Sequence, residues 1–275
     1  MNTDKLRMII DYSKGHREDI SSMIRKFCAI TGMDYDNDVL NILQIVRSSF
    51  RERGYLVFEM PFADGEIGAL CYKGDGMGYV VINTSLPRVN ANFAITHEIY
   101  HVFFQESEFV SKIEFSNDDY YDHEEEFAAN LMAGMLLMPE ISFRRMYRRF
   151  SEESKGNELD TIIRLMAYYQ VPYMAALVRC YELDLPAKHT IPEELLSITR
   201  ADVKGKFREM WLDDSILEAS NKDDYELIES FVENKGKEYI KDSYINERTL
   251  KKVLQNMRTL HDKIEGGVSH DNTIH

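Results

Sequence analysis

The sequence of 275 residues predicts an α+β protein, in which a small antiparallel sheet of three strands packs on a helix that carries potential metal ligands. Three observations predict this class. Apolar residues recur three and four apart over most of the chain, as they do in amphipathic helices. Between Gly54 and Asn83 they form three short β-rich runs instead. A motif with two histidines and one glutamate follows the last of these runs.

Two amphipathic helices are expected before the sheet, over residues 19–31 and 36–53. In the second helix, Val39, Ile42 and Val46 recur at helical spacing. The N-terminal region contains no apolar run long enough for a signal peptide, and no segment approaches the roughly 20 apolar residues that span a bilayer. We therefore expect a cytoplasmic protein that does not enter a membrane.

Three strands are expected next. Two turn sequences separate them, Ala63-Asp64-Gly65 and Gly74-Asp75-Gly76, and both are typical of hairpins. Strands that follow one another through hairpin turns pair antiparallel, so the sheet is expected to be antiparallel throughout. The predicted strands are Tyr55–Met60, Ile67–Tyr72 and Gly78–Asn83.

The helix after the sheet contains FAITHEIYH, Phe93 to His101. Residues four apart share one face of a helix, so His97 and His101 can bind a single cation. Glu98 reaches the edge of the same site, where it can take a proton from a metal-bound water rather than bind the metal. A catalytic zinc site of this kind also needs a third protein ligand and an open position for water.

The third ligand is expected in the next apolar helix, EEEFAANLMAGMLLMP from Glu124 to Pro139. Its carboxylates follow His101 after about 25 residues, which is enough for a loop and a return onto the first helix. Acidic residues in a first helical turn are also favoured by the helix dipole without any function. His123 is a rival ligand one turn before Glu126, and we interpret it as a solvent-facing residue.

Together these pieces resemble the ImmA/IrrE family of metallopeptidases over roughly residues 55–185. The resemblance implies a zincin-like fold with one Zn²⁺ per chain, bound by His97, His101 and Glu126. It also implies that Asn130 hydrogen-bonds a ligand histidine, and that the third strand offers its edge to a peptide substrate. The segments that carry the resemblance are VVIN at 80–83, FAITHEIYH at 93–101, E-x-x-A-N at 126–130 and LLMP at 136–139.

The resemblance further implies a zinc-dependent endopeptidase with Glu98 as the general base. Members of the family include proteases that cut helix-turn-helix repressors of phages and mobile elements, so such a repressor is the expected partner. The alternative is a non-catalytic module, stabilised by metal, that acts through protein partners or DNA. Glu98 favours the enzyme, because metal binding alone needs no base beside the first ligand.

The region after Pro139 is expected to pack on the core rather than to bind nucleic acid. Leu159–Leu183 has the outline of a helix-turn-helix, but Arg179 is the only basic residue of its second helix. The net charge of −14 also disfavours a phosphate-binding surface. Between Pro139 and Leu159 lies an arginine-rich helix, ISFRRMYRRF at residues 141–150. Its arginines form either a solvated face or a docking patch for an acidic partner.

Residues 184–192 read as a linker between a metallopeptidase domain, 1–190, and a helical C-terminal extension, 191–275. About ten residues at the end are expected to be disordered. The segment 105–126 is long for a plain connection, and is either a substrate-binding lid or a mobile loop. The three cysteines, Cys28, Cys71 and Cys180, do not have zinc-site spacing and are interpreted as reduced thiols. The sequence does not indicate the oligomeric state.

Overall fold

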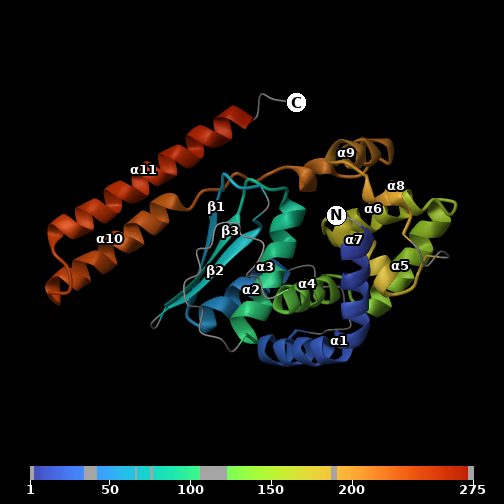
Figure 1. Cartoon of the computed structure of the whole chain (residues 1–275), viewed down its shortest axis with the longest axis horizontal. Coiled ribbons are helices and arrows are strands. Elements are labelled where there is room, and N and C mark those ends of the chain that lie inside the picture. Colours follow the sequence, from blue (N-terminus) through green and yellow to red (C-terminus); the bar gives the residue numbers. More distant parts are fainter. Residues whose placement is uncertain are drawn as a thin grey trace.

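The computed structural model describes residues 3–33, 42–65, 67–74, 77–105, 123–186 and 191–271. Helices pack on one side of a small sheet, and a helical hairpin follows at the C-terminus (Figure 1), so the predicted α+β class is confirmed. The elements are α1 Thr3–Thr31, α2 Ile42–Glu52, β1 Tyr55–Met60, β2 Ala69–Gly74, β3 Met77–Asn83, α3 Arg88–Phe103, α4 His123–Leu137, α5 Glu140–Glu153, α6 Glu158–Tyr169, α7 Tyr173–Glu182, α8 Glu193–Leu196, α9 Arg200–Glu209, η1 Asp214–Leu217, α10 Tyr225–Lys241 and α11 Glu247–Asp271.

The sheet is mixed, so the prediction of an antiparallel sheet is wrong for one pair of strands. The strand order is β1-β3-β2, with β3 parallel to β1 and antiparallel to β2. The chain therefore crosses over after β1 instead of turning back in a hairpin. The predicted free edge on β3 is also wrong, because β3 is paired on both sides. The strand at the edge beside α3 is β2.

Asn83 explains why the chain crosses over. Its side chain is fully buried at the end of β3, where its oxygen accepts from the N–H of Phe62 at 3.1 Å. Its amide group donates to the carbonyls of Asp64 and Ile67 at 3.0 and 2.8 Å. The N–H of Asn83 donates to the carbonyl of Gly68 at 3.0 Å. One residue thus satisfies the polar groups of a connection that passes over the end of the sheet, as buried backbone requires.

Helix α3 is positioned by an apolar face that packs in the core between the sheet, α1, α2 and α4. Ile95, Ile99 and Val102 lie on this face and are buried in that core. Because a helix advances 100° per residue, the spacing of these three residues places His97 and His101 on the opposite side. The core therefore determines which side of α3 faces the candidate site.

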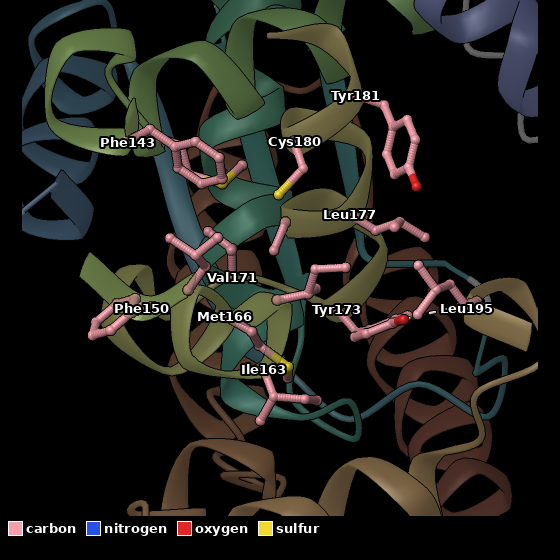
Figure 2. Packing of buried hydrophobic residues seen from close by; sticks show 14 of the residues in the cluster. Phe143, Phe150, Ile163, Met166, Val171, Tyr173, Leu177, Cys180, Tyr181 and Leu195 are labelled. Atoms are coloured by element: carbon pink, nitrogen blue, oxygen red, sulfur yellow. Dashed lines mark hydrogen bonds between the residues drawn. The ribbon is translucent and has the colours of Figure 1, made fainter. Parts of the chain in front are cut away.

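The helix pair α6 and α7 packs in a second hydrophobic core, as Figure 2 shows for Val171, Tyr173 and Leu177. The Tyr173 hydroxyl donates to the carbonyl of Leu195 at 3.0 Å. Arg179 is 1% exposed, and its guanidinium bonds Glu182 at 3.1 Å. The predicted packing role of this pair is therefore confirmed, and the one basic side chain of α7 is inside the protein.

The arginine-rich helix is α5, and two of its arginines pair within the helix. Arg144 bonds Glu140 at 2.7 Å, and Arg149 bonds Glu153 at 2.9 Å. Pairs four residues apart add a few tenths of a kcal/mol to an exposed helix. These contacts favour the solvated face over the docking patch.

The C-terminal helices α10 and α11 form a hairpin that extends away from the sheet (Figure 1). Two hydrogen bonds join the hairpin to β1. The N–H of Glu59 donates to the carboxylate of Asp224 at 2.9 Å, and the N–H of Asp224 donates to the carbonyl of Glu59 at 2.8 Å. Helix α11 continues to Asp271, so the described part of the predicted disordered end is helical.

The expected lid lies largely in residues 106–122, outside the described residues. Among the helices that are described, none is both long and apolar enough to cross a membrane.

Gly78 on β3 is expected to tolerate no side chain. A Cβ atom there would lie 2.4 Å from ring carbons of Tyr55, its partner on β1, and that ring is buried in the core. We expect Gly78→Ala to lower the free energy of unfolding by about 1–3 kcal/mol, as overpacking does. Urea denaturation of the metal-free protein measures the change.

The matched control is Gly15→Ala in α1. Gly15 is exposed, and a Cβ atom there would meet nothing within 4 Å. Because alanine favours the helix over glycine, this variant should be up to about 1 kcal/mol more stable than the original protein. Equal stability of the two alanine variants would contradict the close packing of Tyr55 on Gly78.

Candidate metal centre

The structure brings the three predicted ligands together where α3 meets α4. The Nε2 atoms of His97 and His101 lie 3.0 Å apart. The carboxylate oxygens of Glu126 lie 3.3 Å from Nε2 of His97 and 3.6 Å from Nε2 of His101. Glu126 stands in the first turn of α4, and the two histidines occupy successive turns of α3.

These separations fit a tetrahedral zinc site. Atoms that bind zinc at about 2.0–2.1 Å in tetrahedral geometry lie about 3.3 Å from one another. The two Nε2 atoms lie 3.0 Å apart, and each has one oxygen of the Glu126 carboxylate near that distance, Oε2 at 3.3 Å from His97 and Oε1 at 3.6 Å from His101. Two imidazoles and one carboxylate also form a common donor set of catalytic zinc sites, which leave a fourth position to water or substrate. The residues present therefore fit the ion predicted from the sequence.

Asn130 lies where the sequence predicted it, one turn after Glu126 on α4. Its Oδ1 atom is 3.1 Å from Nδ1 of His97. Because an amide oxygen can only accept, Nδ1 of His97 donates in this hydrogen bond. In the neutral ring the lone pair then lies on Nε2, the atom directed at Glu126, whereas in the protonated ring Nε2–H donates to Glu126. A metal ligand in this tautomer needs no rearrangement.

Gln105 is a residue of the site that the sequence reasoning missed. It follows the end of α3, and its Oε1 atom is 2.7 Å from Nδ1 of His101. Its amide nitrogen donates to Glu125, one residue before the ligand Glu126. Its spacing could have predicted this contact, because a glutamine four residues after the second histidine lies one helical turn beyond it.

Glu98 is buried beside the two histidines. Its side chain is 6% exposed, and its Oε2 atom has no hydrogen-bond partner in the described part of the chain. Burial raises the pKa of the Glu98 carboxyl, and the neighbouring histidines offset part of that rise. A buried carboxylate costs stability unless it is paired. A carboxylate with raised proton affinity, next to a metal site, suits a base.

The electrostatics of the ligands favour a positive charge between α3 and α4. Burial would lower the pKa of His97, but its hydrogen bond with Glu126 and the nearby Glu98 carboxylate raise it overall. Burial would raise the pKa of Glu126, but the same hydrogen bond lowers it overall. The two carboxylates therefore stabilise a cation on the histidine face of α3, as a site for a metal dication must.

The other residues considered from the sequence do not join this group in the described structure. Helix α4 begins at His123, but the side chain of His123 lies outside the described residues. Glu124 is exposed. Tyr120 and Tyr121, in the segment expected to be a lid or a mobile loop, also lie outside the described residues.

Comparison with protein-family models matches residues 50–181 to the model described as IrrE N-terminal-like domain, Peptidase_M78. The matched segment begins in α2 and ends in α7, so it includes the sheet and both helices of the candidate centre. A search of curated proteins found no match.

Removing the Glu126 carboxylate is expected to abolish tight metal binding. Glu126→Ala leaves two imidazoles, and we expect zinc affinity to fall more than about 100-fold, beyond the 10–100-fold typical of residues that only support a ligand. Competition with a chromophoric chelator measures the affinity. Glu124→Ala, two residues earlier in the same turn, is the control and should bind zinc normally. Equal affinities in the two variants would remove Glu126 from the ligand set.

Proposed function

Residues 50–181 belong to the ImmA/IrrE family of metallopeptidases, and from this premise we propose that the protein is a zinc-dependent endopeptidase. The observation that carries the proposal is the combination of three converging ligand side chains with a buried carboxylate, Glu98, beside them. A site that only binds metal needs the three ligand side chains alone. A hydrolytic site needs the ligands and also a carboxylate beside them.

Each residue has a separate task in the proposed reaction. His97, His101 and Glu126 would hold the zinc, which when bound acidifies water and polarises the scissile carbonyl. Glu98 accepts the proton from the attacking water and returns it to the leaving amine. The burial of Glu98 supports this task, because a carboxylate with a raised pKa takes up a proton more readily near neutral pH.

The alternative function is a non-catalytic module that uses the metal for stability and binds a protein partner or DNA. The state of Glu98 argues against it. An unpaired carboxylate oxygen in a buried position destabilises the fold, and such groups persist mainly where function requires them. Replacing Glu98 with an apolar residue would serve a purely structural metal site better.

We propose a helix-turn-helix repressor of a phage or mobile element as the substrate, on the strength of the family alone. The substrate strand is proposed to lie along β2, because β2 is at the edge of the sheet and packs against α3. An extended peptide can pair with such an edge through main-chain hydrogen bonds. The edge strand β2 thus takes the place that the sequence had suggested for β3.

The cysteines support the proposal of activity in the cytoplasm. Cys28, Cys71 and Cys180 are free thiols. Burial raises the pKa of Cys71 and Cys180, so their reactive thiolate forms are disfavoured. Free, unreactive thiols are typical of proteins in a reducing compartment.

The role of Glu98 predicts a separation between binding and hydrolysis. Glu98→Gln keeps the size of the side chain but removes the base, so we expect zinc content to stay at about one ion per chain while hydrolysis falls at least about 100-fold. Metal analysis and single-turnover cleavage measure the two effects. Unchanged hydrolysis in this variant would exclude Glu98 as the base.

The proposed substrate class predicts cleavage of the repressor encoded beside this protein. Incubation without chelator should yield new fragments, and incubation with chelator should leave the repressor intact. Mass spectrometry of the fragments identifies the cleaved bond. A stable complex without cleavage would favour the binding module, and retardation of DNA by this protein alone would favour a direct DNA-binding regulator.

A further inference from the structure

Each of the two ligand histidines makes a hydrogen bond through Nδ1, the ring nitrogen that points away from the candidate centre. Asn130 contacts Nδ1 of His97 at 3.1 Å, and Gln105 contacts Nδ1 of His101 at 2.7 Å. Asn130 belongs to α4, so its bond joins the two ligand helices directly. Gln105 follows α3, so it can join the two helices only through a further residue.

Glu125 is that further residue, and it determines which way the Gln105 amide faces. A carboxylate can only accept a hydrogen bond, so the group that faces Glu125 is the amide nitrogen. The oxygen of Gln105 must then face His101. Because this oxygen can only accept, Nδ1 of His101 donates to it, and in the neutral ring the lone pair on Nε2 faces Glu126.

The backbone also holds Gln105 in place. Its N–H donates to the carbonyl of Tyr100 at 3.1 Å, which ties the residue to the last turn of α3. Glu125 lies in the first turn of α4, one residue before Glu126. The chain of contacts from Glu125 through Gln105 to His101 therefore begins and ends on residues whose helices carry ligands.

We propose that Gln105 is a positioning residue of the metal centre, which sets the ring orientation and tautomer of His101 and is itself oriented by Glu125. Residues that support ligands in this way typically change metal affinity 10–100-fold when they are removed. The inference rests on the proposed metal site but does not require hydrolysis. Zinc affinity and the protonation pattern of the ring are therefore its readouts.

The first test is Gln105→Met, which keeps an unbranched side chain of similar length and removes the amide. We expect zinc affinity to fall about 10–100-fold. Gln255→Met, at an exposed position of α11, is the control and should bind zinc normally. Affinity in Gln105→Met equal to that of the original protein, together with the loss expected in Glu126→Ala, would overturn the proposal and leave the proposed function standing.

The second test distinguishes the hydrogen bond that Glu125 accepts from Gln105 from the effect of its negative charge. Glu125→Gln retains an oxygen that accepts from Gln105 and should match Glu124→Gln, which removes the same charge from the same turn. Glu125→Leu should bind zinc more weakly than either. The double variant Gln105→Met, Glu125→Leu should bind no more weakly than Gln105→Met alone, because Glu125 acts through Gln105. Additive losses would exclude this route.

The third test needs no metal, so it also applies if the protein binds no zinc and the proposed function fails. Long-range ¹H–¹⁵N NMR of the metal-free protein identifies the nitrogen that carries the proton in each histidine ring. We expect His101 to be protonated on Nδ1 in the original protein and in Gln255→Met, and to become a mixture of tautomers in Gln105→Met. An unchanged His101 pattern in Gln105→Met would overturn the proposal.

Discussion

The candidate metal centre depends on the packing of α3 against α4. Neither helix has a complete set of ligands, since α3 carries the two histidines and α4 carries the carboxylate. The apolar face of α3 is buried in the core, and this burial supplies the free energy that holds the histidine face against the start of α4. Ligand separations of 3.0 to 3.6 Å are therefore a property of the core as much as of the ligands.

Glu98 shows how the same packing changes the properties of the carboxyl group that we propose as the base. It follows His97 by one residue, so it lies between the ligand face of α3 and the face that enters the core. Because the core excludes water, the carboxylate is desolvated and its pKa rises. Burying this group without a partner for Oε2 among the described residues lowers the stability of the fold, and the apolar core that buries α3 offsets that loss.

Much of the site could be predicted from local spacing, whereas its supporting contacts could not. His97, Glu98 and His101 follow from helical periodicity. The length of the connection predicted a third ligand among the carboxylates of the next helix, and the resemblance to the metallopeptidase family identified Glu126 among them. The contact between Gln105 and Glu125 joins residues 20 apart, and it depends on how the two helices meet. The parallel pairing of β1 with β3 was missed for a similar reason, because Asn83 organises the crossover from a position beyond the turn sequence itself.

The strand order has a consequence for how the chain folds during synthesis. β3 lies in the middle of the sheet but leaves the ribosome last of the three, so β1 and β2 have no hydrogen-bonding neighbour until residues 77–83 emerge. Between the end of β1 at Met60 and the end of β3 at Asn83 about two dozen residues are translated, so β1 stays unpaired for roughly one to a few seconds, and β2 for less. Variants that slow the entry of β3 between them should aggregate at this stage rather than lose stability once folded.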